Sequence, residues 1–212
     1  MTPERLISVL HEEVIYAHLL HETFFQVFDS TEDVTRLLED SDEQFFLLIN
    51  SIYLDAIPLS FTRLLDPAKT GSKDNLSLFY LIEQTSLSAH NDFGKWLSDL
   101  KTIREAAQKF FDARNKVTGH LDLVINANRA SIPRPSFSRT DIQEIYHRIT
   151  TWLNEVRLGL GLPYCSYNIG VANFQYARPL LLTLGEGRKS LNQKAAAGQV
   201  PKLPSDKVSP YS

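Results

Sequence analysis

The chain has 212 residues, of which 43% are apolar and 22% charged, and its formal net charge at pH 7 is −3. This balance is typical of a soluble globular protein that buries its core as one domain, and it argues against a general nucleic-acid coat protein. Cys165 is the only cysteine. An intramolecular disulfide and a cysteine-based zinc or iron–sulfur site within one chain are therefore excluded, and a cytoplasmic location is favoured.

The first residues show no basic segment followed by an apolar core, which is the pattern of a classical export signal. We also expect no apolar stretch long enough to cross a bilayer. The sequence therefore predicts a protein without a membrane anchor.

Apolar residues recur at steps of three and four, which predicts an all-α bundle of about five to six helices. The helices expected in chain order span residues 4–28, 41–65, 76–90, 93–127, 141–158 and 177–194. Their expected caps are Thr2, Ser41, Asn75 and Thr140. Pro58 is expected to kink the second helix, and Gly119 is the weakest point of the fourth. We assign residues 1–194 to one helical domain and residues 195–212 to a disordered tail.

The charge is distributed unevenly along the chain. Residues 1–66 hold three basic and thirteen acidic residues, a net charge of −10, whereas residues 101–139 hold eight basic and three acidic residues, a net charge of +5. A local basic surface on an acidic protein can draw a polyanion to one place. The alternative is a solvated helix face that happens to carry lysine and arginine.

The basic segment contains the pattern Arg114-Asn115-x4-His120. Arginine binds phosphate through a rigid fork of donors, and histidine both accepts and donates protons near neutral pH. Asn115 can hydrogen-bond a phosphate, a ribose hydroxyl or the imidazole. These side chains suit RNA cleavage without a metal, in which the ribose 2′-hydroxyl attacks, His120 moves the proton and Arg114 stabilises the charged phosphorane.

An uninterrupted helix would prevent this chemistry within one chain. Six positions separate Arg114 from His120, which is about 240° around a helix and about 9 Å along it. Either the helix breaks near Gly119, or two protomers bring their motifs together across a twofold axis. Lys116 and Arg129 are the candidate residues for further RNA contacts.

The motif resembles the Arg-polar-x4-His signature of HEPN domains. Together with the upstream elements Arg63-Leu64-Leu65-Asp66-Pro67 and Asn75-Leu76-Ser77-Leu78, it resembles the AbiU-like abortive-infection branch over roughly residues 5–160. The resemblance implies a homodimeric ribonuclease that requires no metal or other cofactor and acts in phage defence or as a toxin. It also implies that an antitoxin or another defence protein is a possible partner.

One departure from the family limits its regulation. HEPN toxins that are silenced by nucleotidyltransferase antitoxins carry a tyrosine two residues after the histidine, and this chain has Asp122 there. We therefore expect no control by AMP transfer onto this position. Some HEPN domains bind nucleotides or proteins without cutting, so a non-catalytic binding module remains the alternative.

Two other groups of residues compete for a function. His11, His18 and His21 lie among glutamates on the first helix, where His18 and Glu22 are four apart. Neither the His-Glu-x-x-His spacing of zinc proteases nor a paired Glu-x-x-His is present. We expect a solvated acidic helix or interface histidines there and no metal. The aromatic residues Trp96, Phe110 and Phe111 could stack on bases, but their helical spacing favours the core.

Overall fold

The structure of the protein, a computed structural model, describes residues 2–115, 137–167 and 177–199. It confirms the all-α fold, and the only sheet in the described part is a hairpin of two-residue antiparallel strands. The described elements are α1 (Pro3–Val27), α2 (Glu32–Leu64), β1 (Lys69–Thr70), β2 (Lys73–Asp74), α3 (Leu78–Glu83), the 3₁₀ helix η1 (Ser86–Ala89), α4 (Phe93–Ala106), α5 (Gln108–Ala113), α7 (Arg139–Gly159) and α8 (Arg178–Ala196).

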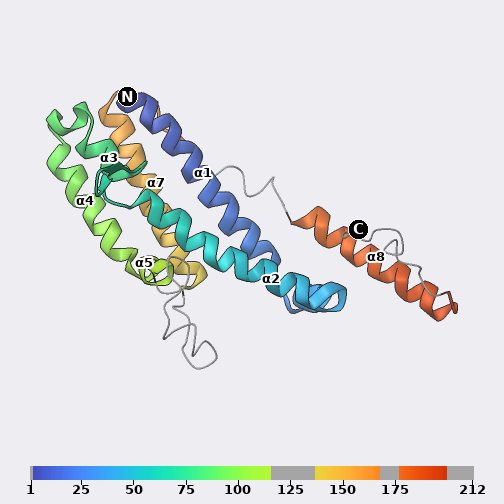
Figure 1. Cartoon of the computed structure of the whole chain (residues 1–212). Coiled ribbons are helices and arrows are strands. Elements are labelled where there is room, and N and C mark those ends of the chain that lie inside the picture. Colours follow the sequence, from blue (N-terminus) through green and yellow to red (C-terminus); the bar gives the residue numbers. More distant parts are fainter. Residues whose placement is uncertain (1, 116–136, 168–176, 200–212) are drawn as a thin grey trace, which may run out of the picture.

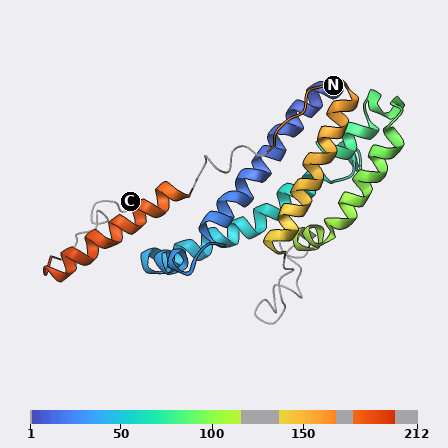
Figure 2. The same cartoon turned by 180° about the vertical axis from the view of Figure 1, so that it is seen from behind.

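The long helices form a bundle in which α1 packs along α2 and α4 packs along α7 (Figures 1 and 2). Contacts between α1 and α7 and between α2 and α5 close the bundle around one main core. Leu10, Ile57, Phe61, Leu100 and Phe110 are almost completely buried in it. Each such side chain contributes about 1.5–3 kcal/mol when it leaves water, so the core holds α5 firmly against α2.

The start of α1 follows the sequence prediction. Thr2 caps the helix, since its hydroxyl accepts a hydrogen bond from the Arg5 amide, and Pro3 occupies the first turn. The end of α7 at Gly159 is also as predicted. Its start differs, because Ser138 and not Thr140 is the cap and forms a capping box with Asp141.

The second helix begins earlier than predicted. A segment capped by Thr31 precedes the expected start near Ser41, and the two parts of α2 meet at Asp42, whose backbone is non-helical (φ −166°, ψ 90°). The Asp42 carboxylate accepts a hydrogen bond from the Phe45 amide and so caps the second part. Pro58 lies inside α2, and the break in the helix is at Asp42.

The third and fourth helices are shorter than predicted. The third ends at Glu83 and is followed by η1. The fourth breaks at Ala107 (φ −82°, ψ 7°), which separates α4 from α5. The break that we predicted near Gly119 falls outside the described residues. Trp96, Phe110 and Phe111 are buried, which confirms their assignment to the core.

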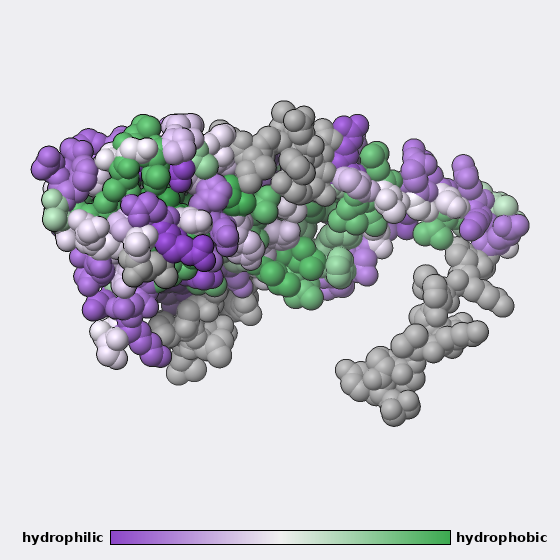
Figure 3. All heavy atoms as spheres, turned by 90° about the horizontal axis from the view of Figure 1, so that it is seen from above, coloured by the Kyte–Doolittle hydropathy of each residue, from purple (hydrophilic) through white to green (hydrophobic). Residues whose placement is uncertain are grey.

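The last helix, α8, extends away from the bundle and contacts α2 (Figures 1 and 2). A second, smaller apolar cluster joins them, and it consists of Val27, Leu38, Phe46 and Ala177 with Leu181 and Leu184 packed against it. Seen from above, hydrophobic side chains are exposed in the middle of the molecule, between the bundle and the end of α8 (Figure 3). The expected tail overlaps the end of α8 at Ala195 and Ala196, and its residues 200–212 fall outside the described part.

Among the described residues, α2 alone is long and apolar enough to cross a membrane by length and composition. The expectation that the chain has no such stretch is therefore wrong. A mostly buried core helix of a soluble protein passes the same test, whereas 28% of the apolar window of α2 is buried. The end of α2 supplies Ile57, Phe61 and Leu64 to the main core.

Candidate functional site

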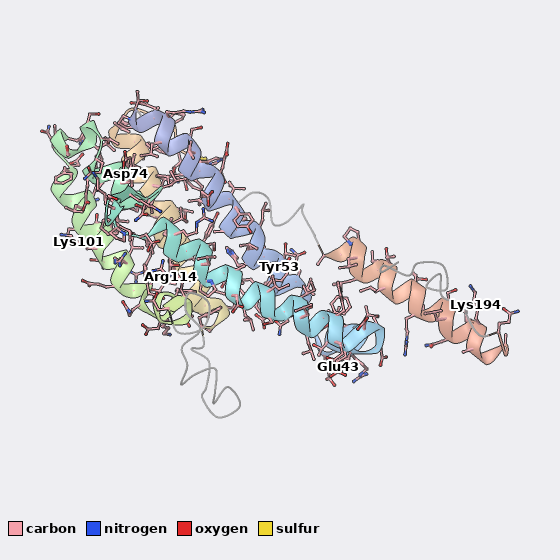
Figure 4. The ribbon with its side chains drawn as sticks, viewed as in Figure 1. Glu43, Tyr53, Asp74, Lys101, Arg114 and Lys194 are labelled. Carbon is pink, nitrogen blue, oxygen red and sulfur yellow. The ribbon has the colours of Figure 1, made fainter. Side chains whose placement is uncertain are left out.

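The first two residues of the motif lie where α5 ends. Arg114 and Asn115 directly follow α5, and Arg114 keeps helical backbone angles (φ −56°, ψ −49°). Figure 4 shows Arg114 where this end of the helix lies beside α2. The buried side chains of Phe110 and Phe111 fix the helix immediately before it.

The guanidinium of Arg114 is held on three sides. Its Nη1 donates a hydrogen bond to the Asp66 carboxylate at 2.7 Å, and its Nε donates to the Asn115 side-chain oxygen at 3.4 Å. The Phe111 ring lies beneath it, with 5.0 Å between the guanidinium carbon and the ring centroid. The side chains of Arg114 and Asp66 are 22% and 24% exposed, so solvent and a ligand can still reach this pair.

A second arginine fixes the segment that carries Asp66. Arg104, on α4, stacks on the same Phe111 ring at 4.4 Å and donates a hydrogen bond to the Leu65 carbonyl oxygen. Leu65 and Asp66 are adjacent, directly after the end of α2. Arg104 of α4 and Arg114 at the end of α5 therefore bind the same turn of the chain. The position of Asp66 is thereby set by contacts from outside its own segment.

The loop after Asp66 is fastened by Asn75. Its amide donates hydrogen bonds to the Pro67 carbonyl and to the Thr70 hydroxyl, each at 2.8 Å. The prediction that Asn75 caps the next helix is wrong, because Ser77 accepts the capping hydrogen bond from the Tyr80 amide of α3. The Leu-Asp-Pro and Asn-Leu-Ser-Leu elements therefore form one loop that places a carboxylate on Arg114.

This arrangement has a limited set of chemical uses. Arg114 is always charged and carries five N–H donors, of which the described contacts use two. The other donors can bind a phosphate oxygen, and the Asn115 amide can bind beside them. The Asp66 carboxylate orients the guanidinium, but it also reduces the net positive charge that a phosphate would meet.

The remaining predicted site residues are His120, Lys116 and Arg129, and all three lie outside the described residues. The structure brings Arg114 and Asn115 together and gives no geometry for the other three. Sequence reasoning assigned no role to Asp66 or Arg104. The Leu-Asp-Pro element was noted as a family feature, but no local spacing connects it to Arg114.

Acidic partners neutralise three basic residues in the described part of the basic segment. Besides Arg114, Lys109 pairs with Asp141 at 2.8 Å, and Arg139 pairs with Asp29 at 2.9 Å. Arg139 also lies over the Phe25 ring. Lys109 of α5 binds α7, and Arg139 of α7 binds the end of α1 and the residues after it. These contacts favour a role in holding the fold together, and not in binding RNA, for Lys109 and Arg139.

Two alternatives were expected for the histidines of α1, a solvated acidic helix or interface histidines, and the first is wrong for His18 and His21. His18 and His21 are only 3% and 1% exposed, because they share the helix face that carries the buried residues Val14, Ala17 and Phe25. Burial, reinforced by neighbouring His21, lowers the pKa of His18. A hydrogen bond from His21 lowers the pKa of the Glu22 carboxyl. A neutral imidazole and an ionised carboxylate thus lie side by side.

The model of the AbiU2 family of HEPN domains matches residues 4–164. This range covers the bundle from the second residue of α1 to the end of α7, and it includes the Arg114-Asn115-x4-His120 pattern. No curated protein and no solved structure matches the chain.

Proposed function

The chain belongs to the AbiU2 family of HEPN proteins, an abortive-infection family, and on this premise we propose that it is a metal-independent endoribonuclease acting in phage defence or as a toxin. The observation that carries the proposal is the placement of Arg114 and Asn115 side by side at the end of α5. They are within reach of solvent, and Asp66 fixes the guanidinium. A preorganised cation is what a transition state with growing negative charge requires.

The proposed reaction uses the RNA as its own nucleophile. A base, His120 in one copy, removes the proton from the ribose 2′-hydroxyl, and the 2′-oxygen attacks the adjacent phosphorus. Arg114 stabilises the charge on the phosphorane oxygens, and Asn115 orients the phosphate or the imidazole. The bond to the 5′-oxygen then breaks, an acid protonates that oxygen, and a 2′,3′-cyclic phosphate remains. DNA is spared because it has no 2′-hydroxyl.

One reaction needs both a base and an acid, and each chain carries one His120. We therefore propose a homodimer in which the two motifs converge across the twofold axis and form a composite cleft. Lys116 and Arg129 would add phosphate contacts at its edge. We further propose that the protein is cytoplasmic and is controlled by an antitoxin or another defence protein.

The test is cleavage of structured and single-stranded RNA by the purified full chain, with and without EDTA. We expect cutting under both conditions and its loss in Arg114→Ala and His120→Ala. Arg148→Ala is the matched control, since Arg148 lies on α7 and pairs with Glu144 of the same helix. Equal cutting by the wild type and by both motif variants would rule out the proposed site.

A second function has one observation in its favour. Because Asp66 already neutralises Arg114, the pair could serve to fix the fold, and the surface around it could bind a nucleotide or a partner protein without cutting. Binding of RNA or nucleotide by the wild type, with no cleavage in any buffer, would support this non-catalytic module.

A further inference from the structure

Two histidines and a glutamate gather on one face of α1. His18, His21 and Glu22 follow a spacing of i, i+3 and i+4, so one helical turn brings their side chains together. One nitrogen from each ring and one carboxylate oxygen lie within 4.8 Å of one another. This is a compact set of donor atoms far along the chain from Arg114 and Asn115.

The cluster is buried, yet most of its nitrogens have no partner. His18 Nδ1, His18 Nε2 and His21 Nδ1 are inaccessible to solvent and accept or donate no hydrogen bond among the residues that the structure describes. The fourth nitrogen, His21 Nε2, lies 3.5 Å from Glu22 Oε1. The great majority of buried polar atoms in proteins have a hydrogen-bond partner, so three unpartnered nitrogens in one place require a physical reason.

Aromatic rings hold the two imidazoles in position. Tyr146 of α7 stacks on His18 and meets His21 edge-on, with 5.0 Å between the ring centroids in each case. Phe61 of α2 stacks on His21 at 6.1 Å. The Tyr146 hydroxyl donates to the Tyr167 carbonyl oxygen, so it is engaged elsewhere and does not satisfy the histidines.

The open side of the cluster is at the glutamate. The side chain of Glu22 is 16% exposed, whereas that of His21 is 2% exposed. A small ion can therefore enter past the carboxylate, while the rings opposite it are closed off by the core.

We propose that His18, His21 and Glu22 bind one divalent transition-metal ion of the zinc class, with solvent at the remaining coordination position beside Glu22. Two imidazoles and one carboxylate are ligands that zinc accepts, whereas Mg²⁺ and Ca²⁺ prefer an all-oxygen set. The ion gives one nitrogen of each ring a partner and fixes the side chains of this turn of α1, whose imidazoles pack on Tyr146 of α7 and Phe61 of α2. Its role is structural, and it shares no residue with the proposed RNA site.

The first test measures metal uptake by the full chain without a polyhistidine tag. After removal of metal with a chelator, we titrate Co²⁺ and follow the visible absorption of the bound ion, then add Zn²⁺ as a competitor. We expect one equivalent of Co²⁺ per chain, displaced by Zn²⁺, and a rise in Tm when Zn²⁺ is added. A wild-type chain that binds neither ion would overturn the site.

Variants locate the ligands. Glu22→Gln and His21→Asn should weaken Co²⁺ binding by at least about tenfold, and Zn²⁺ should no longer raise the Tm. Glu12→Gln, on the exposed side of α1, and His147→Asn, exposed on α7, are the matched controls and should bind as the wild type does. Circular dichroism checks that each variant is folded. If Glu22→Gln is folded and retains wild-type affinity, the assignment is wrong, whatever the outcome of the RNA assay.

Discussion

The guanidinium of Arg114 and the carboxylate of Asp66 form a hydrogen-bonded ion pair at 2.7 Å, although 48 positions separate them in the chain. Arg104 and Asn75 fix the backbone on either side of Asp66. The pair therefore orients the first residue of the motif from a rigid loop. In the proposed reaction, Asp66 is a positioning residue that acts through Arg114.

Asp66→Asn keeps the shape of this side chain and removes its charge. We expect kcat for RNA cleavage to fall by about tenfold, since the guanidinium loses its fixed orientation. The affinity for RNA should stay the same or increase, because one negative charge is lost near the phosphate. Single-turnover kinetics and a binding titration separate the two effects. Faster cleavage by Asp66→Asn would mean that Asp66 restrains Arg114 instead of orienting it.

Gly159 is required by the close approach of Trp96. A Cβ atom at this position would lie 2.4 Å from Cζ2 of the buried indole. Gly159→Ala should therefore destabilise the protein by about 1–3 kcal/mol, which urea unfolding measures. In the control Gly94→Ala the added Cβ meets no atom within 4 Å, and the better helix propensity of alanine should leave stability unchanged or raise it by up to about 1 kcal/mol. Equal effects of the two substitutions would contradict this packing.

Much of the fold could be predicted because its signals are local. Apolar periodicity located α1 and α7, and Thr2-Pro3 and Gly159 marked their ends. The break at Ala107 has no such signal, since alanine is a strong helix former, and the helix bends where α5 packs on α2. At Ala107, the packing of α5 on α2 therefore outweighs the helix propensity of the local sequence.

The site was less predictable than the fold because it depends on a contact between residues that are far apart in the sequence. Arg114 and Asn115 are neighbours in the chain, so their contact could be predicted from the sequence. Asp66 contacts Arg114 only because α2 packs against α5 in the folded protein. The burial of His18 and His21 could have been predicted from their spacing on α1. They continue the apolar face of Val14 and Ala17, but the glutamates around them pointed to a solvated helix.

The start of α7 provides a test with an internal control. Ser138 accepts a hydrogen bond from the Asp141 amide and forms the capping box, whereas Thr140 was the cap expected from sequence. Ser138→Ala should lower the free energy of unfolding by about 1 kcal/mol, and Thr140→Ala should change it by less than about 0.5 kcal/mol. The reverse order in urea unfolding would show that the helix begins at Thr140 in solution.

The composite cleft requires two copies of the chain. We expect analytical ultracentrifugation to give twice the chain mass of 24.1 kDa at the protein concentrations used for cleavage. Dilution below the dimer dissociation constant should reduce the activity per chain, because each cleft takes residues from both protomers. Full activity in a strictly monomeric sample would contradict the shared site.

The chemistry of the RNA ends tests the central claim most directly. Full-length chain is incubated with an RNA and with the same RNA carrying 2′-O-methyl groups at every position, and the products are analysed by mass spectrometry. The account predicts fragments that end in 2′,3′-cyclic phosphate from the unmodified RNA only, and none from either RNA with Arg114→Ala or His120→Ala. Cleavage of the methylated RNA, or 5′-phosphate ends formed equally by wild type and variants, would contradict it.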